Sequence, residues 1–126
     1  MKSRDTLLRL KRFQADGKRR RVQQIEMMTA EFERMAAELE REIALEEART
    51  GIADPAHFAY STYAAAARTR RDNLLRSAAG LRDQLDVARA ELEAALEELK
   101  AVESLGDRER VAEEWRPPAR ASRAGA

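Results

Sequence analysis

Few side chains in this sequence of 126 residues are of the kinds that carry out chemistry. There is no cysteine, so the chain has neither thiolate chemistry nor disulfides. Its single histidine, His57, cannot by itself form a histidine metal cluster or a catalytic triad. Glu38, Glu42 and Glu46 are spaced four apart, but a carboxylate metal centre in a helical bundle also needs Glu-x-x-His motifs, which the sequence lacks. We therefore expect that the protein has no catalytic residue, no metal ligand and no cofactor, and that it is not an enzyme.

The most basic run in the sequence is Lys-Arg-Arg-Arg at residues 18–21. Such runs bind nucleic acid or acidic lipid, although on a coiled coil they are more often a solvated face opposite an acidic helix. No aromatic residue is interleaved with the run and the net charge is only +1, so we expect no nucleic-acid partner. A generic coiled-coil adaptor, or a nucleic-acid-associated scaffold that uses this basic N-terminal arm, is kept as the alternative function.

The composition predicts long helices rather than a compact mixed fold. Charged residues make up 37% of the chain, and aromatic residues only 5%. Apolar residues follow heptad spacing in two stretches, as in helices that pair along a seam. No segment has the roughly 18 apolar residues of a membrane span, and the N-terminus lacks the apolar run of a secretory signal, so we expect a soluble, intracellular protein. The first predicted seam is Val22, Ile25, Thr29, Phe32, Ala36, Leu39 and Ile43, and the second is Leu74, Ala78, Leu81, Leu85, Ala88, Leu92, Ala95, Leu99 and Val102.

Stop and start signals lie close together between the two stretches. Gly51 suits a helix C-terminus, and Asp54 followed by Pro55 suits a helix N-terminus. The sequence therefore predicts an all-α fold, an antiparallel two-helix coiled-coil hairpin spanning residues 1–115. Its parts are expected to be helix 1 at about 4–49, a tip at 50–55, helix 2 from about 55 to 115, and a disordered C-terminal tail at 116–126.

The charge pattern predicts the same hairpin independently of the seams. Residues 1–23 carry nine basic and two acidic side chains, whereas residues 24–50 carry three basic and eight acidic ones. Residues 51–82 carry five basic and two acidic side chains, and residues 83–105 carry two and seven. Folding the chain at about residue 53 places each basic block along an acidic block, and such complementarity selects the partner helix in coiled coils.

Three of the six aromatic residues, Phe58, Tyr60 and Tyr63, lie within a stretch of six residues just after the predicted tip. A two-helix hairpin has little room to bury three rings beside its own turn. Two interpretations stay open at this point: the rings pack on the loop, or some of them bind a partner, since aromatic residues are enriched at interfaces.

Several segments resemble the FliJ family of flagellar export proteins, in its alphaproteobacterial form. They are the opening MKSRDTLLRLKRFQ, the tip GIADPAHFAYSTYAAAA and the RTRRDNLLRSA that follows it. The resemblance covers roughly residues 1–105, and Gly17 departs from an unbroken first helix. It implies a cytoplasmic stalk of the type III export apparatus, peripherally associated with the inner membrane at the flagellar base and needed for flagellum assembly and motility.

The resemblance also implies the partners and where they bind. One end of the hairpin would enter the export ATPase ring, a FliI hexamer. The tip would contact the export gate FlhA, and the protein would reach the membrane only indirectly, through this gate. Export chaperones would be further partners. By position along the rod, the gate-binding residues would be Phe58, Tyr60 and Tyr63, and the ATPase-binding residues would be Arg4, Arg9, Lys11, Arg12, Leu99 and Val102.

Overall fold

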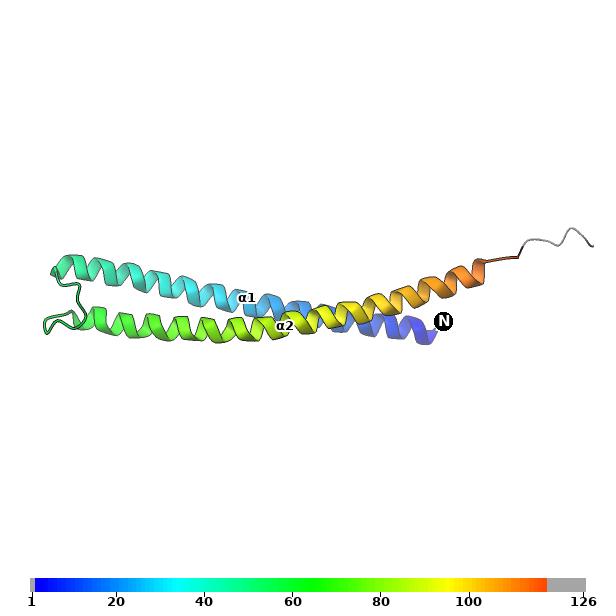
Figure 1. The fold of residues 1–126 in the computed structure, drawn as a ribbon, viewed down its shortest axis with the longest axis horizontal. Coiled ribbons are helices and arrows are strands. Elements are labelled where there is room, and N and C mark those ends of the chain that lie inside the picture. Colours follow the sequence, from blue (N-terminus) through cyan, green and yellow to red (C-terminus); the bar gives the residue numbers. More distant parts are fainter. Residues whose placement is uncertain (1, 118–126) are drawn as a thin grey trace, which may run out of the picture.

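The computed structural model describes residues 2–117 as a helical hairpin. Helix α1 spans Lys2–Thr50 and helix α2 spans Thr62–Glu114, and the two pack against each other in opposite directions (Figure 1). The described residues contain no strand. The predicted all-α hairpin is therefore confirmed.

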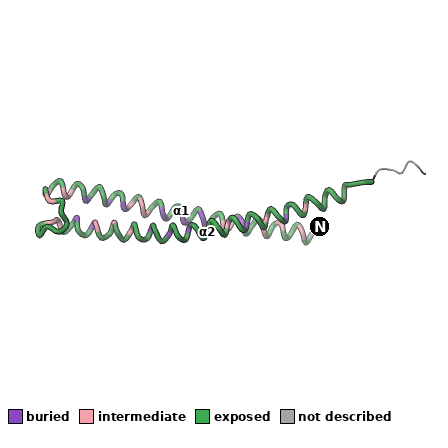
Figure 2. The backbone as a smooth tube through the Cα atoms, viewed as in Figure 1, coloured by how far each residue is buried: buried purple, intermediate pink, exposed green. Residues whose placement is uncertain are grey.

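The core of the hairpin is a narrow seam along the facing sides of the two helices (Figure 2). Both predicted stripes lie in it, and none of their residues is exposed. Ile25 is the largest fully buried side chain, and burying such a side chain stabilises a fold by about 1.5–3 kcal/mol. Thr29 is the one polar member of the stripes. Its burial is tolerated because its hydroxyl donates a hydrogen bond to the carbonyl oxygen of Ile25 at 2.8 Å.

The beginning of α1 packs less closely than the rest. Ala15 is the only residue from 3 to 21 that is buried, whereas Leu10 and Phe13 are exposed. Polar residues interrupt the apolar stripe here, which explains the loose packing. Gly17 nevertheless causes no break in the helix.

Ion pairs between the helices follow the predicted charge pattern. Near the chain termini, Lys18 Nζ lies 3.0 Å from Glu91 Oε2. Towards the tip, the signs are reversed, and Arg71 Nη1 lies 2.9 Å from Glu40 Oε1. Because exposed pairs contribute only about 0.2–1 kcal/mol each, they bias the orientation while the seam supplies most of the stability.

The predicted start of the second helix is wrong by seven residues, because α2 begins at Thr62 rather than near Pro55. Asp54 does accept a backbone hydrogen bond, but from Ala56 two residues later, so it closes a turn instead of capping a helix. The N-cap is Ser61, whose hydroxyl oxygen accepts from the backbone N–H of Ala64 at 3.2 Å. The tip is thus the longer segment 51–61 rather than 50–55.

At the other end, α2 extends past the N-terminus of α1 (Figure 1). Glu114 is its last residue, and Trp115 is extended, with its N–H donating to the carbonyl oxygen of Val111 at 2.9 Å. The predicted end of the second helix near residue 115 is confirmed, and the prolines at 117 and 118 explain it because proline cannot continue a helix. Of the tail predicted at 116–126, residues 118–126 lie outside the described part of the chain.

Candidate partner-binding surfaces at the two ends of the hairpin

The tip is a loop held mainly by local hydrogen bonds. Gly51 has φ of +75°, which is the left-handed conformation that glycine adopts most easily, and its N–H donates to Glu47 O at 2.9 Å. Further along, the N–H of His57 donates to Asp54 O and the N–H of Tyr60 donates to His57 O, each at 3.0 Å. These bonds turn the chain back towards α2.

Three glutamates near the end of α1 fix the returning chain through its hydroxyl groups. Tyr60 Oη donates to Glu47 Oε2 at 2.7 Å, and Tyr63 Oη donates to Glu42 Oε2 at 2.9 Å. Between them, Ser61 Oγ lies 3.3 Å from an oxygen of Glu46. Figure 1 shows the loop closing the gap between the two helices at this end.

These contacts change the acidity of both tyrosines. Partial burial, followed by the hydrogen bond to Glu47, raises the pKa of Tyr60 above its ordinary value. The hydrogen bond to Glu42 is the main cause that raises the pKa of Tyr63. Each hydroxyl is thus held in its neutral, donating form. Both tyrosines therefore contribute hydrogen bonds that hold the tip, although the side chain of Tyr63 is still 57% exposed.

Phe58 behaves differently from both tyrosines. Its side chain is 97% exposed, and it stacks on His57 with the ring centroids 4.7 Å apart. His57 Nδ1 accepts from the backbone N–H of Ala59 at 3.0 Å, so the imidazole is itself tied to the loop. The structure therefore presents one phenylalanine ring to solvent on a loop whose neighbours are fixed.

The open end of the hairpin, made of residues 2–12 and 99–115, carries the other predicted binding residues. Arg4 is paired with Glu109, Lys11 Nζ lies 3.0 Å from Glu98 Oε2, and Arg12 lies 3.7 Å from Glu103. Three of the four predicted cations are thus engaged across the hairpin.

The remaining three predicted residues of the open end differ in their access to a partner. Arg9 is exposed and forms no ion pair within residues 2–117. Leu99 is half-buried and Val102 is buried, so both belong to the seam. Of the four cations predicted to bind the ATPase, Arg9 is therefore the one that forms no ion pair within the described residues.

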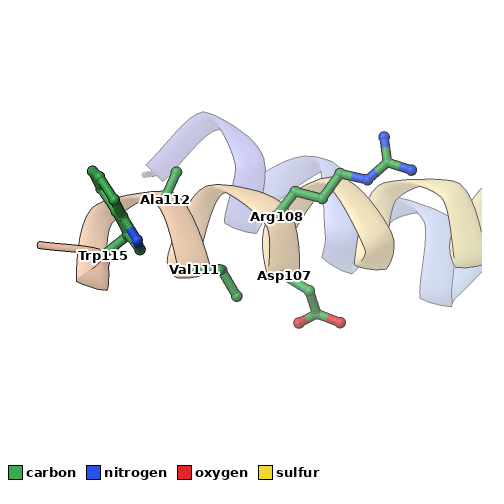
Figure 3. A pocket seen from close by; sticks show the side chains of 5 residues that line it. All are labelled: Asp107, Arg108, Val111, Ala112 and Trp115. Atoms are coloured by element: carbon green, nitrogen blue, oxygen red, sulfur yellow. The ribbon is translucent and has the colours of Figure 1, made fainter. Parts of the chain in front are cut away.

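Two exposed residues of the open end were not predicted from the sequence. Val111 is 61% exposed and Trp115 is 65% exposed. They line a shallow surface hollow at the end of α2 together with Asp107, Arg108 and Ala112 (Figure 3). The spacing of four residues between these two apolar side chains, which puts them on one face of a helix, is a signal in the sequence that indicates such a surface.

No protein-family model, curated protein or solved structure matches this chain. The chemistry of its two ends must therefore be judged from their side chains. Within residues 2–117, no group of three or more His, Asp or Glu side chains is placed to hold a metal ion. Neither described helix has a segment long and apolar enough to cross a membrane.

Proposed function

We propose that the protein is a non-enzymatic stalk of a flagellar type III export apparatus. In this role it would link the FliI ATPase ring to the FlhA export gate and assist the delivery of chaperones and their substrates. The proposal rests on the resemblance of the opening and tip segments to the FliJ family, together with the unlike chemistry of the two ends. Its location would be the cytoplasmic side of the inner membrane, with contact to the membrane only through the gate.

The observation that carries the proposal is the exposure of Phe58 at the closed end of the rod. A ring that is 97% exposed contributes little to the stability of the hairpin itself. Anchored aromatic side chains are typical of the energetically dominant residues of protein interfaces. The bonds of Tyr60 and Tyr63 to Glu47 and Glu42 hold the loop in place, so little ordering would remain to be done on binding.

At the open end, the charge of Arg9 and the exposed side chains of Val111 and Trp115 would face the ATPase. Trp115 and Val111 supply apolar area, and Arg9 supplies a cation. Leu99 and Val102 would act from the seam, by keeping the two helices together. A rod that contacts two partners couples them when each contact is stronger in one state of that partner.

The gate contact is tested by replacing Phe58 with alanine. We expect F58A to leave helicity unchanged and to weaken binding to the purified cytoplasmic part of FlhA by about tenfold or more, as for other anchoring aromatics. The matched control is F13A, because Phe13 is also exposed, at 69%, but lies far from the tip. Equal binding by F58A and the unchanged protein would refute the tip contact.

The ATPase contact is tested by titrating the chain into purified FliI while ATP hydrolysis and ring formation are followed. Activation of ATP hydrolysis that is lost on deleting residues 1–12 would support the role as a stalk and show that the open end of the hairpin binds the ATPase. A lack of both binding and activation would remove the flagellar function and leave only the hairpin.

A specific observation favours the alternative of a nucleic-acid-associated adaptor. Within the described residues, Arg9, Arg20 and Arg21 are exposed and form no ion pair, so their charges are available. Binding through such residues weakens steeply with added salt, whereas docking through Phe58 weakens little. Affinity for a duplex oligonucleotide, measured at low and at moderate salt, separates the two functions.

A further inference from the structure

The half of the hairpin away from the tip has two unlike sides. One side has a hollow lined by two interhelical ion pairs, Glu26 with Arg89 and Glu33 with Arg82. At the same level, a second hollow is lined by Arg21, Ile25, Gln84, Val87, Ala88 and Glu91. Arg21 directly precedes the seam residue Val22, whereas Glu26 directly follows the seam residue Ile25, so helical periodicity puts the two hollows on opposite sides of the seam. We call the side with the second hollow the groove side.

Apolar residues, most of them exposed, recur along the groove side of each helix with heptad spacing, with Gln14 and Gln24 among them in α1 and Glu91 and Glu98 among them in α2. In α1, helical periodicity places Leu7, Leu10, Gly17 and Met28 in line with Arg21. In α2, it places Ala94, Ala101 and Leu105 in line with Val87. The large members of both stripes are exposed: Leu7 at 41%, Leu10 at 48%, Met28 at 45%, Val87 at 59% and Leu105 at 52%.

The two stripes match each other level by level along the rod. The interhelical pair of Lys11 with Glu98 puts Leu10 of α1 near the level of Ala101 of α2. The pair of Lys18 with Glu91 puts Arg21 close to the level of that same carboxylate. At the levels of Leu10 and Arg21, an apolar or basic position of α1 thus has an apolar or acidic counterpart on α2, whereas Met28 lies at the level of the neutral Gln84.

We propose that the groove side is where a second copy of this chain binds. The two hairpins would lie side by side in the same direction, with α1 of each over α2 of the other, and form a four-helix bundle away from the tips. A two-fold axis along the rod makes every contact occur twice. Leu7 and Leu10 of one copy then meet Ala101 and Leu105 of the other.

Charge is the first reason why the occupant is a second copy. Arg21 is exposed and forms no ion pair within the described residues, although it lines the same hollow as Glu91. In the proposed bundle it faces Glu91 of the other copy. The pairing of cationic α1 with acidic α2 is the same one that the hairpin uses internally, and it favours the same-direction arrangement.

Gly17 is the second reason. A glycine within a helix costs about 1 kcal/mol relative to alanine. A Cβ atom at this position would meet only the Arg20 side chain, at 3.8 Å, so packing within the hairpin does not require glycine. In the bundle, Gly17 lies at the level of Ala94 of the other copy, where two small residues let the helix backbones approach closely.

The first test is sedimentation equilibrium of the full chain over a range of concentrations. We expect a mass twice the 14.3 kDa of the monomer at high concentration. Arg21→Glu places like charges together and should weaken the dimer by about tenfold or more. The control is Arg9→Glu, which makes the same charge change at an exposed, unpaired residue that does not line the groove.

The second test determines which residues of the two copies lie side by side. Because the chain has no cysteine of its own, any disulfide that forms must join the introduced cysteines. Met28→Cys and Gln84→Cys are made in separate chains, which are then mixed and oxidised. We expect the mixed disulfide to form faster than either homodimer, because residue 28 of one copy lies beside residue 84 of the other.

Two results would overturn the proposal. A chain that stays monomeric at all concentrations would leave the groove side to a helix of some other protein. A dimer weakened equally by Arg21→Glu and Arg9→Glu, or one without preference for the mixed disulfide, would form through a different surface. Neither result depends on FliI or FlhA, so this test and that of the proposed function fail separately.

Discussion

The hydroxyl of Tyr60 donates a hydrogen bond to Glu47 across the tip, with 2.7 Å between Oη and Oε2. This bond links the last turn of α1 to the segment that leads into α2, thirteen residues later. It explains why the chain turns through a long loop rather than starting α2 directly after Pro55. It also separates the tip aromatics into a structural residue, Tyr60, and an exposed one, Phe58.

The bond predicts a loss of stability in alkali. The pKa of Tyr60 lies above the ordinary tyrosine value of 10.0, so at higher pH the unfolded chain loses this proton before the folded chain does. The stabilising contribution is therefore complete below pH 10.0 and is lost as the pH rises through the folded-state pKa. Urea unfolding midpoints from pH 8 to pH 11 should fall less in Tyr60→Phe than in the unchanged protein. Identical slopes would show that the bond is absent in solution.

The seam predicts a large effect at Ile25. This residue is 1% exposed, and replacing it with alanine removes its packing against the second helix, so the free energy of unfolding should fall by about 2–4 kcal/mol. The control is Met27→Ala, because Met27 is 72% exposed and surface changes are usually within about 0.5 kcal/mol. Urea unfolding followed by circular dichroism measures both. Similar losses in the two variants would mean that the seam runs elsewhere.

Ser61 is expected to be the start signal of α2. Its hydroxyl satisfies the N–H of Ala64, so Ser61→Ala should lower stability by about 1 kcal/mol. Asp54→Ala, at the N-cap that the sequence suggested, should leave helical content unchanged because Asp54 only closes a turn. Circular dichroism and urea unfolding distinguish the two sites. A larger loss of helix from the Asp54 variant would place the start of α2 where the sequence predicted it.

The helices were predictable because their seams are long and regular. Seven heptad positions in α1 and nine in α2 outweigh any single exception, so even the polar Thr29 fits the pattern. The register followed from charge blocks, and pairs such as Arg71 with Glu40 have the expected signs. Both signals are periodic or summed over many residues, which makes them robust.

The tip and the binding residues were less predictable because they depend on single long-range contacts. Asp54 and Ser61 are both good N-cap residues, and the choice between them is made together with the bonds of Tyr60 and Ser61 to glutamates on α1. Likewise, position along the rod suggested Val102 as an ATPase-binding residue, although the heptad pattern had already placed it in the seam, where it is buried. Access to a partner depends on the exact face of the helix that a residue occupies.

Two glycines should respond to alanine in opposite directions. Gly51 has φ of +75°, a conformation that strains any residue with a Cβ atom, so Gly51→Ala should destabilise the hairpin by about 1 kcal/mol. Gly80 lies inside α2, and a Cβ atom there would meet nothing within 4 Å, so Gly80→Ala should stabilise the hairpin by about 1 kcal/mol. Thermal unfolding of the two variants side by side gives both signs. If Gly51→Ala were neutral, the end of α1 would not use the left-handed turn, and the helix would continue further into the tip.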